Sequence, residues 1–172
     1  MKSIINLFLI LSLLLATPDL MAQSYKFGHI NSADLLATMP AAKSAEKELE
    51  TFSTQLDKQY KDMLQTFQTE YQEVQGDVGQ GILTPKQIEE KEQAFQVKQQ
   101  ELQKFEMEAQ QKIQAKREEL IGPILKNAEQ AIKDVATENG FSYIFDTSLG
   151  SGVLFAEPSE DVMTLVKTKL GL

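Results

Sequence analysis

The stretch Val74–Gln87 (VQGDVGQGILTPKQ) lies near the middle of the 172-residue chain and interrupts a pattern that is otherwise helical. It contains three glycines and a proline, Gly76, Gly79, Gly81 and Pro85. Glycine and proline are the poorest helix formers, so one continuous helical rod through this stretch is disfavoured. We therefore predict a tip loop at residues 76–84 that joins two helices.

Apolar residues before this loop recur every three or four positions, which is the spacing of one helix face. From Leu49 the pattern repeats every eleven residues, a period that does not favour a tight left-handed supercoil. The stripe consists of Ala45, Leu49, Phe52, Leu56, Tyr60, Met63, Phe67, Tyr71 and Val74. We expect a long amphipathic helix over residues 41–75.

The segment after the loop opens with a helix start signal. Thr84 can cap the helix, Pro85 suits its first position, and Gln87 completes a capping box. The methylene stems of lysines that interrupt an apolar stripe can cover apolar surface. The stripe here is Ile88, Phe95, Leu102, Phe105, Ala109, Ile113, Leu120 and Ile124, interrupted by Lys91, Lys98 and Lys116. The pattern predicts a second long helix over residues 85–121.

The two predicted helices have nearly equal lengths, about 52 Å and about 55 Å at a rise of about 1.5 Å per residue. Equal lengths suit an antiparallel hairpin whose two helices start and end at one base. Two helices alone cannot bury every aromatic side chain of their stripes. Residues 41–121 therefore predict a coiled-coil-like arm that either oligomerises or keeps apolar surface exposed for binding.

The segments on either side of the arm, 23–40 and 122–172, predict a small body domain. Residues 26–30, 141–146 and 153–156 have the short apolar pattern of strands. The resulting fold class is α+β, mostly α, with a long helical hairpin projecting from the body. The candidates for the body core or for an oligomer interface are Phe27, Ile30, Leu35, Ile132, Val135, Tyr143, Phe145, Val153 and Phe155.

Gly122 and Pro123 lie where the arm enters the body. Proline removes a backbone donor and its ring clashes with the preceding turn, so we expect a kink here and a further helix after it. The pair is a candidate hinge that would let the arms spread around a large ligand. A fixed kink is the alternative.

The first 22 residues have the features of a secretory signal peptide. Lys2 precedes a nearly unbroken apolar run from Ile4 to Ala16, and Ala22 provides a small residue for cleavage. The run is too short to span a bilayer comfortably, and no cysteine follows it that could be lipidated. We expect export to the periplasm and removal of residues 1–22. A retained N-terminal anchor is the alternative.

The chain carries a net charge of −8, and removing residues 1–22 takes away one basic and one acidic residue, so the charge is unchanged. This excess of acid argues against a nucleic-acid partner and against membrane binding by charge alone. The sequence has no cysteine and a single histidine, His29, and it lacks phosphate-binding and nucleophile motifs. We expect no enzymatic activity, no metal and no cofactor.

Three stretches resemble the Skp (OmpH-like) family of periplasmic chaperones, both in content and in order. They are FGHINSADLLATMPAAKSAEKEL, LIGPILKNAEQAIKDVATENGFSYIFD and VLFAEPSEDVMTLVKTKL, and the likeness spans Tyr25 to Leu170. The resemblance implies a homotrimer whose strands form a shared core and whose arms enclose a cavity. It also implies that unfolded outer-membrane proteins are held in this cavity without ATP and without catalytic residues.

One property departs from the family's pattern. Well-known members are strongly basic, whereas residues 41–121 of this chain contain 11 basic and 16 acidic side chains. Electrostatic capture of acidic clients is therefore not expected of these arms.

Two hypotheses about function fit the sequence. The first is a holdase chaperone whose arms bind unfolded chains through many weak apolar contacts, for which adaptable methionine and aromatic side chains are suited. The second is a structural spacer or adaptor of the cell envelope that binds one folded partner. The candidate client-contact residues are Met63, Phe67, Tyr71, Val74, Ile88 and Phe95. The alternative for these six is packing between the two helices of the arm.

Overall fold

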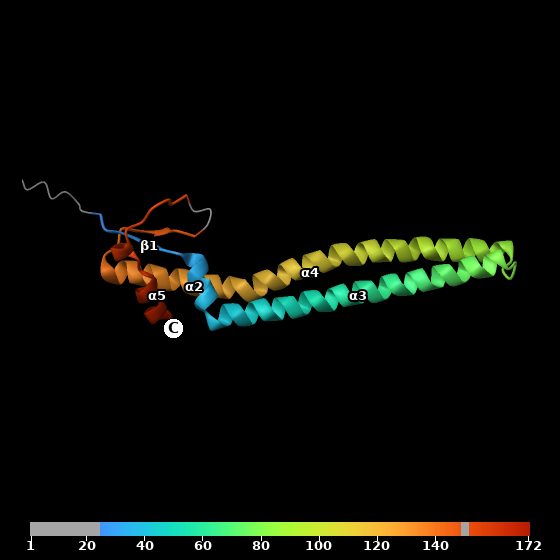
Figure 1. Cartoon of the computed structure of the whole chain (residues 1–172), viewed down its shortest axis with the longest axis horizontal. Coiled ribbons are helices and arrows are strands. Elements are labelled where there is room, and N and C mark those ends of the chain that lie inside the picture. The colour runs from blue at the N-terminus through green and yellow to red at the C-terminus, as the bar shows by residue number, and fades with distance from the viewer. Residues whose placement is uncertain (1–24, 149–151) are drawn as a thin grey trace, which may run out of the picture.

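The computed structural model describes residues 25–148 and 152–172, so the predicted signal peptide lies outside the described residues. In chain order, the elements are β1 (Phe27–Ile30), α2 (Ser32–Thr38), α3 (Pro40–Gly79), α4 (Pro85–Asn139), β2 (Tyr143–Asp146), the 3-10 helix η1 (Pro158–Glu160) and α5 (Met163–Leu170). Figure 1 shows α3 and α4 as a long antiparallel hairpin that projects from a small body. The predicted class, α+β and mostly α, is confirmed.

The first long helix begins one residue before the predicted start, and the second begins at the predicted signal. α3 starts with Pro40 directly after Met39 and runs for 40 residues. At the start of α4, the Thr84 hydroxyl accepts a hydrogen bond from the Gln87 N–H, and the Gln87 side chain accepts one from the Thr84 N–H at 2.9 Å. This capping box satisfies donors that the first turn of a helix otherwise leaves unpaired.

The tip loop is shorter than predicted. α3 continues through Gly76 and ends at Gly79, so the connection comprises only residues 80–84, and the predicted loop start at 76 is wrong. Glycine weakens a helix interior by about 1 kcal/mol but does not prevent it. The chain reverses at Gly81, where φ is 70° and the N–H bonds to the Val78 carbonyl at 3.1 Å. A glycine just beyond the cap favours this left-handed ending.

α4 runs without interruption from the tip into the body (Figure 1), with Pro123 inside the helix. The prediction of a separate helix after Pro123 is therefore wrong. Ile124 and Ala128 pack into the body core just beyond the proline. Proline removes one backbone hydrogen bond of the helix. We attribute the continuity of α4 to the packing of the residues that follow Pro123 against the body core. A hinge at Gly122 and Pro123 stays a prediction, as does the domain boundary there.

β1 and β2 form a two-stranded parallel sheet in which Phe27 pairs with Tyr143 and Ile30 with Asp146. The strands are parallel because α4 runs past the sheet before the chain turns back beyond Asn139 (Figure 1). In the sequence, the whole arm therefore lies between β1 and β2, although these two strands are neighbours in space.

The predicted third strand at 153–156 is wrong, because these residues have no regular structure. The chain instead reaches the free edge of β1 a few residues later. Asp161 forms a single parallel bridge with His29, and the N–H of Val162 donates to the His29 carbonyl at 2.9 Å. β1 is thus the central segment of the body.

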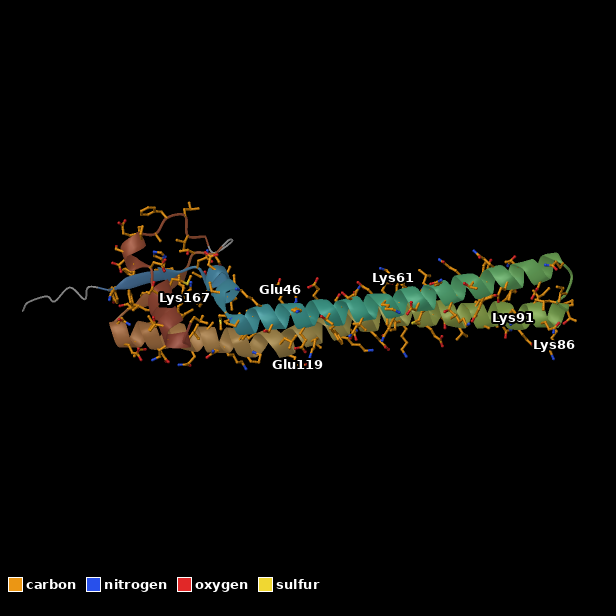
Figure 2. All side chains as sticks on the ribbon, turned by 60° about the horizontal axis from the view of Figure 1, so that its bottom comes forward. Glu46, Lys61, Lys86, Lys91, Glu119 and Lys167 are labelled. Atoms are coloured by element: carbon orange, nitrogen blue, oxygen red, sulfur yellow. The ribbon has the colours of Figure 1, made fainter. Side chains whose placement is uncertain are left out.

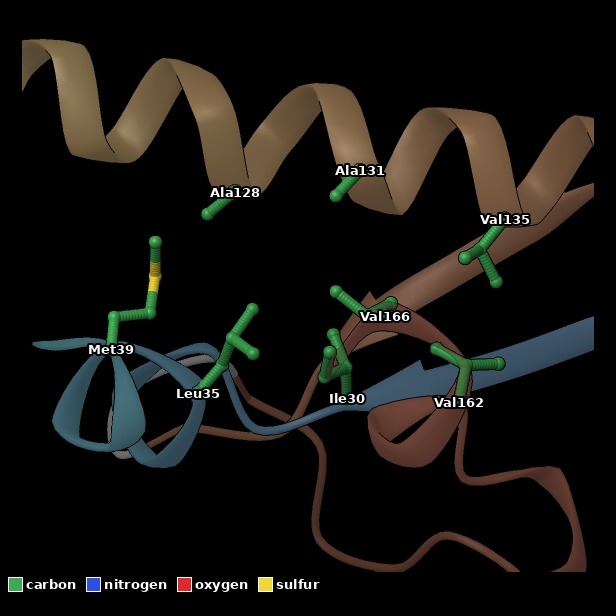
Figure 3. Close-up of a cluster of buried hydrophobic side chains, with 8 residues drawn as sticks. All are labelled: Ile30, Leu35, Met39, Ala128, Ala131, Val135, Val162 and Val166. Atoms are coloured by element: carbon green, nitrogen blue, oxygen red, sulfur yellow. The ribbon is translucent and has the colours of Figure 1, made fainter. Parts of the chain in front are cut away.

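A small apolar cluster holds the body together. It draws on β1, α2, α4, α5 and the connections next to them, and Figure 3 shows α4 lying across the other segments. Two of the α4 residues are alanines, so the helix backbone can approach closely. The members, none of them more than 6% exposed, are Ile30, Leu35, Met39, Ala128, Ala131, Val135, Val162 and Val166.

The nine predicted body residues divide into buried and exposed sets. Ile30, Leu35 and Val135 belong to the cluster, Ile132 packs at its edge, and Val153 is half-buried. Four others are exposed in the single chain: Phe27 by 47%, Tyr143 by 56%, Phe145 by 47% and Phe155 by 80%. A core position for these four within one chain is therefore wrong. The first three lie on the sheet face opposite the cluster, since strand side chains alternate, and the fourth lies in a segment that is not a strand. An oligomer interface for them stays a prediction.

Candidate functional site

The apolar stripes of α3 and α4 face each other and form a narrow seam along the arm. Only Ala45, Leu56 and Leu102 are buried there, with 5%, 7% and 8% of their surfaces exposed. The remaining apolar residues of both stripes are half-buried or exposed. Because no third layer of the chain covers the seam, a long apolar surface remains available for contact.

Three aromatic side chains meet in the outer part of the arm. The ring centroids of Phe67 and Phe95 lie 5.7 Å apart in an edge-to-face arrangement, and those of Tyr71 and Phe95 lie 5.3 Å apart. Phe67 and Tyr71 also stack along α3 at 6.2 Å. These contacts agree with packing between the two helices, yet Tyr71 remains 45% exposed. A role for the three residues in client binding stays a prediction.

The other three candidate client-contact residues are not part of this ring cluster. Met63 lines a groove of about 320 Å³ together with Phe67 and Leu102. Val74 and Ile88 are half-buried and lie nearer the tip. The structure therefore brings four of the six candidates into one region of the arm and leaves two beyond it.

A larger groove lies near the base of the arm and was not predicted from the sequence. It has a volume of about 750 Å³ and is lined by Phe52, Glu48 and Lys116 among mostly polar side chains. Phe52 and Lys116 belong to the predicted stripes of α3 and α4, so the two stripes were the sequence signals for this groove. Most of its lining residues have polar or charged side chains, and this composition distinguishes it from the seam.

Two lysines of the α4 stripe form ion pairs with glutamates of α3. Lys116 Nζ lies 2.9 Å from Glu48 Oε1 on α3 and 3.1 Å from Glu119 Oε1 on its own helix. Hydrogen bonds to Glu48 and then to Glu119 raise the pKa of Lys116. Lys98 pairs with Glu70 on α3. Such partly exposed pairs contribute little to stability. They show which residues of the two helices lie opposite each other.

The outer face of the two-stranded sheet carries four neighbouring aromatic rings. The Phe27 centroid lies 5.8 Å from that of Tyr143 and 6.1 Å from that of Phe145. Tyr143 stacks on Phe145 at 6.2 Å, and Tyr25 lies 6.4 Å from Phe27. All four are between 47% and 56% exposed, and we call them the aromatic face. Contiguous exposed apolar patches are typical of interaction sites, and an interface at the aromatic face stays a prediction.

A carboxylate ties the end of β2 to the start of α2. Asp146 accepts hydrogen bonds from the Ser32 N–H at 3.1 Å, the Ser32 hydroxyl at 2.5 Å and the Ser148 N–H at 2.9 Å. Although Asp146 is exposed, its loss of some hydration raises its pKa, but these hydrogen bonds more than offset this and lower the pKa to about 2. The body is therefore fixed by this polar contact as well as by its apolar cluster.

The described residues contain no arrangement for metal chemistry. His29 Nε2 lies 2.8 Å from the Glu157 carbonyl oxygen, which holds the segment before η1 against β1. Within residues 25–148 and 152–172, no group of three or more His, Cys, Asp or Glu side chains could hold a metal ion. In the same part of the chain, every helix is either too short or too polar to span a lipid bilayer.

The sequence matches the family model for OmpH-like outer membrane proteins over residues 26–170. The fold is similar to the crystal structure of an OmpH-like protein from Caulobacter crescentus CB15, described as a candidate outer membrane chaperone. The TM-score is 0.73 over 90% of this chain and 86% of that chain, at 16% sequence identity. At this identity the likeness concerns the fold. No curated protein matches the sequence.

Proposed function

The chain belongs to the OmpH-like outer membrane protein family, and from this premise we propose that it is a holdase chaperone of the periplasm. It binds unfolded outer-membrane proteins, prevents their aggregation and uses no ATP. The observation that carries the proposal is the arm, in which helices of 40 and 55 residues leave most of their apolar seam incompletely covered. A periplasmic location rests on the signal peptide proposed for residues 1–22.

The arm binds its client through many weak contacts. Each partly exposed seam residue offers a fraction of its surface, and covering about 40 Å² of apolar surface is worth about 1 kcal/mol. A client held by several such contacts loses them one at a time as it folds into the membrane, so its release requires no nucleotide. The polar outer sides of α3 and α4, visible as projecting side chains in Figure 2, keep the complex in solution.

The proposed assembly is a homotrimer joined through the body. The aromatic face supports this, because a two-stranded sheet with one exposed aromatic side is marginal on its own and copies that share this face would cover it. Three arms projecting from one joined body would then enclose a space for the client. The exposed Phe155 belongs to the same proposed interface.

A structural spacer or adaptor that binds one folded partner is the second candidate. The observation in its favour is that the arm is partly self-contained, since Phe67 and Phe95 contact each other and Lys116 pairs with Glu48. A spacer would bind one partner tightly and in fixed stoichiometry. The proposed chaperone binds many unfolded barrel proteins weakly.

Light scattering from a urea-unfolded outer-membrane barrel protein, diluted into buffer with and without the purified chain, tests the chaperone. We expect suppression of aggregation at a few-fold molar excess. A matched pair of variants locates the surface: Tyr71→Ser on the arm removes a ring that is 45% exposed, and Leu165→Ser in α5 removes a side chain that is 43% exposed. Tyr71→Ser should weaken suppression about threefold, because it loses roughly 0.7 kcal/mol of contact. Leu165→Ser should not change it.

The oligomeric state is tested by the mass of the native assembly. We expect three copies for the unaltered chain and dissociation toward single copies when Phe27→Ser and Tyr143→Ser are combined. A single-copy mass for the unaltered chain would reject the trimer, and no suppression of aggregation would reject the chaperone. The two measurements are therefore independent.

A further inference from the structure

Two grooves between α3 and α4 open on the same side of the arm. We call them the base groove, of about 750 Å³, and the middle groove, of about 320 Å³. On α3, Gln55 of the base groove and Thr66 of the middle groove are 11 residues apart, which is close to three helical turns. On α4, Glu119 and Glu101 of the same two grooves are 18 residues apart, which is five turns. Whole numbers of turns on both helices place the two grooves in line along one side.

Both grooves include apolar side chains of the seam. Phe52 lines the base groove, and Met63, Phe67 and Leu102 line the middle groove. Leu102 is buried, but the other three are half-buried, so part of each surface is open to a ligand. The grooves are therefore the places where the seam offers apolar surface inside a concave site.

The two grooves are balanced in charge, although residues 41–121 contain 11 basic and 16 acidic side chains. The base groove is lined by three lysines and two glutamates, and the middle groove by one lysine, one aspartate and one glutamate. Together they contain four charged side chains of each sign. The acidic excess of the arm lies outside the grooves, so a ligand with either sign of charge can enter them.

The distance between the apolar parts of the grooves matches an extended polypeptide. Phe52 lies 11 residues before Met63 and 15 before Phe67, about 17 Å and about 22 Å along α3. In an extended chain, side chains six positions apart are about 20 Å apart and point to the same face. The strands of outer-membrane barrels alternate between apolar and polar residues, so their sequences repeat apolar side chains at this even spacing.

We propose that one extended segment of an unfolded barrel protein lies along this side of the arm and places an apolar side chain in each groove. The inference rests on the proposed chaperone function and deepens it, since it names the bound segment and the side of the arm that binds it. It also states how an acidic arm holds its clients, which is through a charge-balanced track with two apolar sites. A segment of the same composition with clustered apolar residues fills only one groove.

Methionine methyl groups test the location of the bound segment. Beyond residue 22 the chain contains four methionines, Met39, Met63, Met107 and Met163. Met63 lines the middle groove, Met39 is in the body cluster, Met163 packs against that cluster, and Met107 is 60% exposed on α4 and lines neither groove. With the methyl groups labelled with carbon-13, a urea-unfolded barrel protein should change the chemical shift of Met63 and leave that of Met107 unaltered.

The outcomes of this measurement separate the inference from the proposed function. If the chain suppresses aggregation of the barrel protein while the Met63 signal stays unaltered, the chaperone function stands and the groove site is wrong. A change at Met107 without one at Met63 would also reject the groove site. If aggregation is not suppressed, the chaperone function itself fails.

A matched pair of threonine variants tests the middle groove. Thr66 and Thr54 are both exposed on α3, and their hydroxyls donate to the carbonyls of Asp62 and Glu50 at 2.9 Å and 2.8 Å. Thr66 lines the middle groove, whereas Thr54 lines neither groove. Thr66→Gln extends a longer polar side chain over the groove and should weaken binding of the barrel protein about fivefold, because less apolar surface is covered. Thr54→Gln should stay within about twofold of the unaltered chain, and equal effects would contradict the assignment.

The spacing is tested with two dye-labelled peptides of identical, uncharged composition. Each contains two tryptophans in an otherwise polar sequence, either six or three positions apart. We expect the first peptide to bind about fivefold more tightly, because side chains three positions apart span only about 10 Å and cannot occupy both grooves. Equal affinities would show that one segment does not span the two grooves.

Discussion

The arm and the body of this molecule are stabilised in opposite ways. The arm depends on a repeated local pattern in which most stripe residues stay half-buried. The body depends on one small cluster contributed by segments as distant as Ile30 and Val166, none of whose members is more than 6% exposed. A repeated seam distributes its stability over many weak contacts, whereas the cluster concentrates it in a few. The arm can therefore offer apolar surface to a ligand without losing its fold.

The largest expected effect compares the same substitution in the two regions. Leu35→Ala in the body removes a side chain that is 1% exposed, and Leu102→Ala in the arm removes one that is 8% exposed. We expect losses of about 4 kcal/mol and about 2 kcal/mol respectively, because the seam can close around a missing side chain more easily than the packed cluster. Urea unfolding at one fixed protein concentration measures both. Equal losses would remove the distinction between the regions.

A second prediction concerns close packing at β1. A Cβ atom added to Gly28 would lie 2.9 Å from Phe141 Cε1 and 3.2 Å from Val162 Cγ1. Gly28→Ala should therefore cost about 2 kcal/mol through overpacking. The change would be read as a lower urea midpoint with an unchanged slope. Unaltered stability would mean that the ring of Phe141 moves aside freely, and that the body is looser than its burial indicates.

The sequence predicted the arm well because the arm's determinants are local. Apolar spacing, the Thr84 cap and Pro85 each act within a few residues, and the structure places both helices where these signals indicate. The errors arose where packing outweighed propensity. Gly76 remains helical, and α4 passes through Pro123 because residues beyond it are anchored in the body.

The body was predicted less completely because its core depends on distant contacts. Helical spacing after Pro123 predicts an inward position for Ala128. The burial of Ala131 was not predicted, because it depends on the close crossing of α4 over the cluster, which no local pattern reveals. Residues 153–156 have strand composition, but Asp161 occupies the edge position beside His29. The exposed aromatic face was within reach of sequence reasoning, since alternation places Phe27 and Ile30 on opposite sides of a strand.

The candidate site was predicted only in outline. The stripe identified the seam, and Phe67, Tyr71 and Phe95 do meet within it. The ion pairs of Lys98 and Lys116 were not predicted, because their acidic partners Glu70 and Glu48 lie on the other helix. The relative register of two antiparallel helices must be known before such pairs can be assigned.

A third prediction sharpens the role of polar contacts in the body. The pKa of Asp146 is about 2 in the folded chain, below its ordinary value of 3.8. Its hydrogen bonds therefore stabilise the fold above about pH 4, and this contribution disappears as the pH falls toward 2. After discounting for solvent screening of an exposed carboxylate, we expect Asp146→Asn to cost about 1 kcal/mol at pH 7.

Stability measured across pH tests this assignment. The difference between Asp146→Asn and the unaltered chain should shrink between pH 4 and pH 2 and vanish below the lower value. A difference that stayed constant over this range would show that the substitution acts through packing and not through the carboxylate charge. Glu157→Gln, which changes an exposed carboxylate of the body, serves as the control and should leave the profile unchanged.

The smallest predicted effect tests where the arm ends. Gly76 lies in the last turn of α3, where an added Cβ atom would meet nothing within 4 Å, whereas Gly81 has a φ of 70°. Gly76→Ala should therefore stabilise the chain by about 0.8 kcal/mol, the difference in helix propensity between the two residues. Gly81→Ala should destabilise it by about 1 kcal/mol, because alanine is strained in the left-handed region. Opposite signs in thermal unfolding would support a loop of residues 80–84. Were Gly76 part of the loop, as its sequence context predicts, alanine there would bring no helical gain, and the expected rise in the unfolding temperature for Gly76→Ala would be missing.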